Sequence, residues 1–248
     1  MISQREIMGM PITVEIIGDT LTQKDIENIF AYFDHVDKVF STYKQGSEIS
    51  KINRTEITPE QYSEEMKEVL ELSEETKQQT NGFFNIQKLD GTLDPSGLVK
   101  GWAIYKAALE LKNKGFQNFY VEAGGDVQAE GLNKDGQRWL VGIRNPFMAD
   151  EIVKVIECSG NGIATSGTYE RGQHIYNPFN PLQKITDIVS LTVIGPNVYE
   201  ADRFATACFA MGKAGINFLE KQPNLEGYMI DTSGVATMTS GFLKHTKL

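Results

Sequence analysis

Seven apolar residues between positions 26 and 40 recur at spacings of three and four. They are Ile26, Ile29, Phe30, Phe33, Val36, Val39 and Phe40. An α-helix turns once every 3.6 residues, so this spacing places all seven on one face of a helix. Such a stripe must be buried against other elements. The segment therefore predicts a long amphipathic helix packed on a core.

Three further helices are predicted from their end signals. Thr58 offers a capping hydroxyl and Pro59 suits a first helical position, so a helix is expected to begin there. Helices are also expected over residues 98–114 and 200–211. Each of these segments is followed by a glycine, which commonly ends a helix.

The intervening segments are typical of strands. Runs of β-branched or apolar residues predict strands over residues 12–17, 119–122, 139–144, 152–157 and 188–194. The tail is expected to close as a hairpin of residues 228–230 and 235–238. Helices and strands alternate only in part, which favours an α+β fold with mixed or antiparallel sheets. No linker-like stretch divides the chain, so residues 1–248 are expected to form one domain.

The chain is acidic, because 24 Lys and Arg against 33 Asp and Glu give a formal net charge of −9. A nucleic-acid partner is therefore not expected, since phosphate backbones are bound by basic surfaces. A ligand that carries phosphates would find little spare positive charge on the protein. A divalent cation would then be the natural bridge between the two.

Cysteine usage and the N-terminus bear on compartment. Cys158 and Cys208 lie in different expected elements and are interpreted as small core residues, not as metal ligands or a disulfide. No run approaches the roughly 18 apolar residues of a membrane span, so no transmembrane segment is expected. The first residues lack a basic-then-apolar signal. A cytoplasmic location is expected, unless an export or anchoring segment precedes residue 1.

Residues 200–206 place two oxygen ligands one helical turn apart. Asp202 and Thr206 are separated by four positions, so on the expected helix their carboxylate and hydroxyl point the same way. Both are hard oxygen donors of the kind that Mg²⁺ takes beside water and phosphate oxygens. A structural role is the more ordinary interpretation of this segment taken alone, with Asp202 complementing the dipole of the first helical turn and Thr206 facing a neighbour.

Two glycine-containing segments could approach a ligand closely. Free N–H groups around Gly97 at a helix start, together with the Lys100 ammonium, would make a phosphate cradle. The segment lacks the pattern of a Walker loop, and a capping turn with a solvated lysine is the alternative. Gly124 and Gly125 before Asp126 either let a ligand approach the backbone or simply form a turn.

Residues 164–178 are rich in hydroxyl, amide and charged groups. Of the three histidines only His174 lies in such a setting, since His35 falls between helical apolar positions and His245 lies near the tail. A neutral imidazole is the usual group for removing a hydroxyl proton near pH 7, which makes His174 a candidate general base. Ser166 is not interpreted as a hydrolase nucleophile, because no G-x-S-x-G pattern is present.

In their order and spacing these segments resemble the ApbE family, the FAD:protein FMN transferases. The resemblance runs from Met8 to about residue 241. The blocks that carry it are residues 8–10, 40–53, 94–101, 123–126, 166–171, 174–178 and 201–206. Met10 and Gln173 depart from the residues usual in the family at those positions.

The resemblance implies an α+β fold of the ApbE type, related to the T-fold, with FAD in a cleft and its pyrophosphate on Mg²⁺. Residues that would contact FAD are Met8, Tyr43, Asp94, Lys100, Gly125 and Asp126. The metal would be held by the Gly97 carbonyl, Asp202 and Thr206. His174 would assist the transfer.

The implied reaction moves FMN from FAD to a Thr or Ser hydroxyl of an acceptor protein and releases AMP. Two alternatives stay open: hydrolysis of FAD to FMN and AMP at the same site, and flavin binding without catalysis. Residues 231–239 resemble the short acceptor motif of Asp, Ser, Gly, Ala and Thr that the family modifies. A threonine held in the tail hairpin is not expected to be modified, because it would have to leave its ladder of hydrogen bonds.

Overall fold

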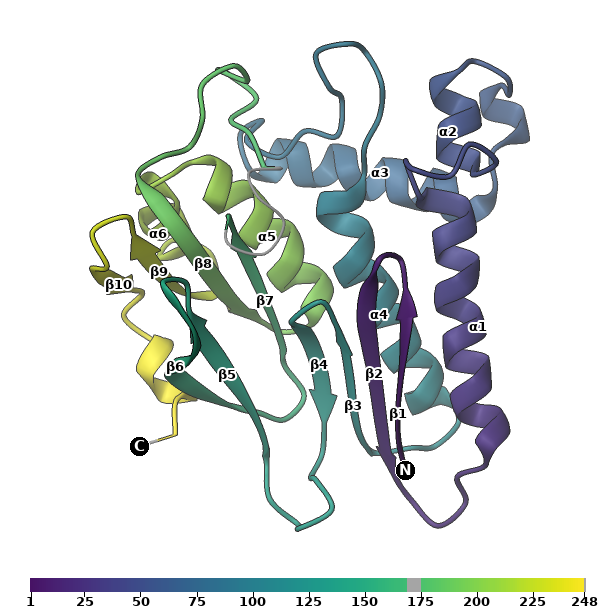
Figure 1. The fold of residues 1–248 in the computed structure, drawn as a ribbon, viewed down its shortest axis with the longest axis vertical. Coiled ribbons are helices and arrows are strands. Elements are labelled where there is room, and N and C mark those ends of the chain that lie inside the picture. Colours follow the sequence, from purple (N-terminus) through teal and green to yellow (C-terminus); the bar gives the residue numbers. More distant parts are fainter. Residues whose placement is uncertain (169–174, 248) are drawn as a thin grey trace.

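The computed structural model describes residues 1–168 and 175–247 (Figure 1). Its centre is an eight-stranded sheet in the order β1-β2-β3-β4-β7-β8-β9-β10, in which every neighbouring pair is antiparallel. The strands are β1 (Ile2–Ile7), β2 (Met10–Ile17), β3 (Asn118–Ala123), β4 (Asp126–Glu130), β7 (Gly162–Gly167), β8 (Ile188–Gly195), β9 (Glu226–Asp231) and β10 (Ala236–Met238). The predicted α+β class with antiparallel sheet is confirmed.

Helices cover one face of this sheet, and a two-stranded hairpin covers part of the other (Figure 1). The longer helices are α1 (Gln23–Phe40), α3 (Glu64–Gln79), α4 (Ser96–Asn113) and α5 (Val198–Ala210), and the shorter ones are α2 (Glu48–Asn53) and α6 (Ala214–Leu219). The hairpin consists of β5 (Trp139–Asn145) and β6 (Met148–Cys158). Neighbouring residues of β7 face the two sides of the sheet, because Ala164 packs with α5 residues whereas Ile163 packs with Trp139 of the hairpin.

The helix predicted from the seven-residue stripe is confirmed as α1. All seven apolar residues are buried, and Thr22 begins the helix with a capping box to Asp25. The helices predicted over 98–114 and 200–211 are also confirmed, with starts two residues earlier. Both cysteines are fully buried, as expected for small core residues.

The prediction that a helix begins at Thr58 is wrong. Thr58 caps only a 3₁₀ turn, Pro59–Gln61, because the Gln61 side chain bonds back to the Thr58 backbone N–H at 2.9 Å and closes the turn on itself. The chain then becomes extended, and α3 begins after Ser63, whose hydroxyl accepts a hydrogen bond from Met66 N at 3.1 Å. Ser63 is therefore the residue that caps the long helix, and Thr58 with Pro59 begins only the short turn before it.

Helices α4 and α5 pack unusually closely, and this packing determines which residues meet between them. A Cβ added to Gly101 would lie 2.6 Å from the Asp202 Cβ and 2.7 Å from the Val198 carbonyl oxygen. A Cβ added to Gly97 would lie 2.9 Å from Thr206 Cγ2. Two glycines one turn apart on α4 therefore let the backbone of α5 approach more closely than any other residue would allow.

Candidate active site

The crossing of α4 and α5 brings together the three residues that the sequence predicts as metal ligands. The Thr206 hydroxyl donates a hydrogen bond to the Gly97 carbonyl oxygen at 3.1 Å. The Asp202 carboxylate accepts one from the Gly101 backbone N–H at 2.8 Å. A carboxylate and a hydroxyl from α5 and a carbonyl from the start of α4 thus share one corner of the protein.

Asp202 lies in an unusual electrostatic setting for a carboxylate. Its residue is only 4% exposed, whereas the sequence suggested the open first turn of a helix. Burial raises the pKa of Asp202, the Lys100 ammonium opposes that rise, and the nearby Asp126 carboxylate adds to it. Lys100 Nζ itself pairs with Asp126 Oδ2 at 2.7 Å. Two adjacent carboxylates therefore have one lysine between them, which leaves a site that suits an added cation.

Asp126 is bound on its other side to the sheet. Its Oδ1 accepts a hydrogen bond from Thr165 N of β7 at 3.0 Å, and the residue is 1% exposed. Lys100, with 17% of its side chain exposed, is held by this carboxylate and is not the solvated lysine of the alternative interpretation. Asp126 touches Lys100 and the sheet but does not line the cleft described next.

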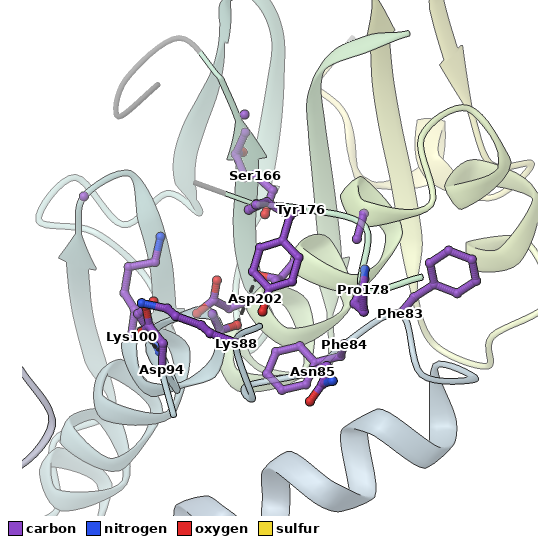
Figure 2. A pocket seen from close by; sticks show the side chains of 18 of the residues that line it. Phe83, Phe84, Asn85, Lys88, Asp94, Lys100, Ser166, Tyr176, Pro178 and Asp202 are labelled. Carbon is purple, nitrogen blue, oxygen red and sulfur yellow. Dashed lines mark hydrogen bonds and ion pairs between the residues drawn. The ribbon is translucent and has the colours of Figure 1, made fainter. Parts of the chain in front are cut away.

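An open cleft of about 460 Å³ lies directly in front of Asp202. Figure 2 shows Lys88, Asp94 and Lys100 on one side of Asp202 and Phe83 and Pro178 on the other. Ser166 of β7 and the α4 and α5 residues form its inner wall. Tyr43 also lines the cleft and is 96% exposed, so its ring is available to a planar ligand at the rim.

Lys88 and Asp94 form a second charged pair in the cleft. Lys88 Nζ lies 2.8 Å from Asp94 Oδ2, and Asp94 Oδ1 accepts a hydrogen bond from Ser96 N at 3.2 Å. Burial opposes ionisation of both groups, but their mutual hydrogen bond prevails: the pKa of Asp94 is lowered and that of Lys88 is raised. Asp94 therefore holds the Lys88 ammonium group at the cleft, and its bond to Ser96 N helps to begin α4.

Lys88 is a cleft residue that none of the sequence patterns above predicted. It lies on a small loop closed by the bridge between Gln87 and Leu93, and Lys88 N donates to the Thr92 carbonyl at 2.8 Å. The signal for it was present, since Asp90-Gly91 is a common turn pair for reversing two short extended segments. Reading that turn would have placed Lys88 beside Asp94.

The remaining predicted FAD contacts occupy different places. Met8 lies in the β1–β2 turn with a φ of 57°, partly buried against the core that α1 and α4 share with the sheet. Gly125 lies in the β3–β4 turn and lines a second cavity next to the cleft. Neither lines the cleft itself among the described residues. His174, the predicted base, lies outside the described residues.

The donor set fits a hard divalent cation. Asp202, Thr206 and the Gly97 carbonyl offer only oxygen, which is the ligand type that Mg²⁺ prefers together with waters and phosphate oxygens. Within residues 1–168 and 175–247 no group of three or more His, Cys, Asp or Glu side chains could hold a metal. A cation here would therefore depend on oxygen atoms of a bound ligand, as is usual for Mg²⁺ in phosphate-handling enzymes.

A cleft with an acidic, oxygen-rich floor and lysines on its wall is the kind of site that handles a phosphate-bearing ligand. The sequence profile of the ApbE family matches residues 8–89 and 86–229. The chain belongs to the ApbE family.

Individual relatives agree with this assignment. The chain is 25% identical to an FAD:protein FMN transferase of Haemophilus influenzae over an alignment that covers 97% of this chain and 90% of the relative. It is 34% identical to one of Vibrio cholerae, over 49% of this chain and 39% of the relative. The latter alignment thus spans well under half the length of that relative.

Solved structures confirm the fold. The flavin transferase ApbE from Vibrio cholerae superposes with a TM-score of 0.86 at 22% identity, covering 99% of this chain and 98% of the other. The ApbE protein from Thermotoga maritima gives a TM-score of 0.87 at 19% identity, over 100% and 99% of the two chains. In the part of the chain that the structure describes, no helix is both long and apolar enough to span a bilayer.

Proposed function

We propose that this protein is a Mg²⁺-dependent FAD:protein FMN transferase, which moves FMN from FAD to a Thr or Ser hydroxyl of an acceptor protein. The observation that carries the proposal is the grouping of Asp202, Thr206 and the Gly97 carbonyl at the floor of a cleft with lysines on its wall. The names of the relatives supply the flavin and the protein acceptor.

Each of these residues has a role in the proposal. Gly97, Asp202 and Thr206 would hold Mg²⁺, which when bound would offset the charge of the FAD pyrophosphate. The N–H groups at the α4 start are mostly engaged, because that of Ser96 is bonded to Asp94 and those of Leu98 and Val99 are bonded to the Pro95 carbonyl, so the phosphates would be met chiefly by the cation and by lysines. Lys88 and Lys100 add positive charge, each oriented by an aspartate, Asp94 and Asp126 respectively.

The remaining assignments follow from the family pattern. Tyr43 would cover the flavin ring at the exposed rim of the cleft, and Met8 and Gly125 would contact FAD from the neighbouring turns. His174 would take the proton of the acceptor hydroxyl. The hydroxyl oxygen attacks the phosphorus of the FMN half, the bond to the bridging oxygen breaks, and AMP leaves with that oxygen.

We also propose that residues 1–248 act as one domain. The central sheet supports this, because the N-terminal strands β1 and β2 and the C-terminal strands β9 and β10 belong to the same eight-stranded sheet. The site itself joins α4 to α5, whose contacting residues are about a hundred positions apart in the chain.

Two other functions are compatible with the same cleft. An FAD pyrophosphatase would use water in place of the hydroxyl, and the high exposure of Tyr43 at the rim would admit water. A flavin-binding protein without catalysis would not require the buried carboxylate of Asp202 or the hydroxyl of Thr206. Their arrangement beside the Gly97 carbonyl favours an enzyme.

One experiment separates the three functions. The protein is incubated with FAD, Mg²⁺ and a Thr-containing acceptor, the acceptor is weighed by intact-mass spectrometry, and free FMN is measured by chromatography. A transferase adds one FMN phosphate ester to the acceptor. Free FMN with an unchanged acceptor mass identifies a hydrolase, and unchanged FAD identifies a binding protein.

A further inference from the structure

A second cavity of about 340 Å³ adjoins the cleft on the opposite face of the central sheet. Its walls come from the β1–β2 and β3–β4 turns, from β5 and from β7. The two cavities share Gly124 and Thr165 as lining residues. The cleft lies on the helix face of the sheet, whereas the second cavity lies on the face that carries the β5–β6 hairpin. We call this second cavity the hairpin-side groove.

A gap between strands β4 and β7 separates the two cavities, and we call this gap the notch. Strands β4 and β7 pair only through Val127 with Ile163 and Gln128 with Gly162, and they diverge beyond that point (Figure 1). At the divergence Asp126 accepts the Thr165 N–H through its side chain at 3.0 Å, in place of a backbone partner on β4. The sheet is therefore interrupted beside Asp126, which pairs with Lys100 and lies close to Asp202.

The notch is bordered by exposed backbone. Gly124 and Gly125 form one side with φ values of 54° and 88°, a conformation that favours glycine. The other side is β7, where Thr165 N points toward β4. In an antiparallel strand alternate residues point the same way, so the N–H and C=O of Gly167 also face the notch. Within the described residues no strand pairs with Gly167 on that side.

We infer that the hydroxyl-bearing segment of the acceptor protein enters through the hairpin-side groove and reaches the cleft through this notch, while FAD occupies the helix side and touches the groove only at its rim, at Gly125. The inference rests on the proposed transferase function. Four of the ten residues that line the groove are glycines, namely Gly9, Gly124, Gly125 and Gly142, and their lack of side chains leaves room for an extended chain of small residues. The edge of β7 could pair with such a chain as an added strand.

The route also satisfies the chemistry. The acceptor oxygen must approach phosphorus opposite the bridging oxygen that leaves with AMP. If FAD fills the helix-side cleft, entry through the notch would let the acceptor reach that position without passing the ligand. The new P–O bond would then form as the bond to the bridging oxygen breaks, and the hydroxyl proton would pass to a general base, the role proposed above for His174.

The test places a removable obstacle in the groove. Pro11 lines the hairpin-side groove, is exposed, and does not line the cleft. A single cysteine at Pro11→Cys can be labelled with a bulky maleimide after folding. The native Cys158 and Cys208 will not react, because both are buried and burial raises the pKa of each thiol. Glu15→Cys, on the same face of β2 but farther from the notch, is the matched control.

Both variants are assayed before and after labelling, with a decapeptide that carries one Thr among Gly, Ala, Ser and Asp. Labelling at Pro11→Cys is expected to lower FMN transfer to the peptide at least about tenfold and to leave the Kd for FAD within about twofold. Labelling at Glu15→Cys is expected to change neither quantity. Each labelled variant is compared with its own unlabelled form, so that any effect of the substitution itself cancels.

Other outcomes overturn the inference. Equal transfer by labelled and unlabelled Pro11→Cys shows that the acceptor uses another route. A weakened Kd for FAD on labelling assigns the groove to FAD instead. If the unsubstituted protein converts FAD to FMN and AMP without labelling the peptide, the proposed transferase function fails, and this result is distinct from failure of the route.

Discussion

Neutralising Asp202 without changing its shape gives the sharpest test of the metal site. In Asp202→Asn the side-chain oxygen can still accept the hydrogen bond from Gly101 N. Asp202→Ala would remove this buried hydrogen bond between an N–H and a carboxylate, at a cost of about 1.5–3 kcal/mol. Because Asp202 is buried, the alanine variant would mix a folding defect with a functional one. The asparagine variant is therefore the informative change.

Without metal, Asp202→Asn is expected to be more stable than the parent protein at alkaline pH. The pKa of Asp202 is raised from 3.8 to about 7, first by burial. A group that binds its proton more tightly in the folded state costs stability as pH rises through that interval. At about 1.4 kcal/mol per pKa unit, the penalty relieved by the amide is at most about 4 kcal/mol at pH 8 and small at pH 4.

When Mg²⁺ is bound, the parent protein is expected to be more stable than Asp202→Asn, the reverse of the order without metal. The amide offers a neutral oxygen in place of a carboxylate, so affinity for Mg²⁺ in the FAD complex should fall at least about 100-fold. Replacing a residue that only hydrogen-bonds to a metal ligand already lowers metal affinity by up to about 100-fold. FMN transfer should fall with it. Urea unfolding at pH 5 and pH 8, with and without Mg²⁺, measures the stability, and calorimetric titration of Mg²⁺ measures the affinity.

Two results would refute this reasoning. If metal-free Asp202→Asn were less stable than the parent at pH 8, the carboxylate would be stabilised by Lys100 more than it is penalised by burial and by Asp126. If its affinity for Mg²⁺ were unchanged, Asp202 would not be a metal ligand. The Gly101 hydrogen bond would then be its whole role.

Three further outcomes are expected. Gly101→Ala should lower the free energy of unfolding by about 1–3 kcal/mol in a urea titration, because its Cβ would meet the Val198 carbonyl and the Asp202 Cβ. FAD should bind much more tightly than FMN in calorimetry, since the cation site and Lys100 would hold the pyrophosphate; equal affinities would contradict this. Incubation with FAD and Mg²⁺ should add no FMN to the chain itself, because Thr237 pairs in β10 and Thr239 is 3% exposed; intact mass decides this.

The sequence predicted the elements whose pattern is local. The stripe of α1, the glycine-ended helices α4 and α5, and the apolar run of β8 each carry their signal within one segment. Grouping Gly97 with Asp202 and Thr206 came from the family pattern, and the structure brings these three residues together.

Elements that depend on distant partners were missed. Strand β1 reads Ile-Ser-Gln-Arg-Glu-Ile, and β7 reads Gly-Ile-Ala-Thr-Ser-Gly, so neither shows clear alternation. Strand β7 is extended because β8 pairs along its length and α5 covers Ala164. The burial of Asp126 was likewise invisible, since it depends on Lys100 and Thr165, which lie in other elements.

A carboxylate and a hydroxyl four residues apart on a helix form a common pair, and by themselves they specify little. Here the second helix supplies what makes the pair selective. Gly97 and Gly101 repeat the same four-residue spacing on α4, so each glycine meets one residue of the other pair. Thr206 bonds to the Gly97 carbonyl, and Asp202 bonds to the Gly101 N–H. A side chain at either glycine would separate the helices and remove the carbonyl from reach of the cation. The information for the site therefore resides in the match between two spacings, and a sequence search for oxygen sites of this kind should require the glycine pair together with the Asp and Thr pair.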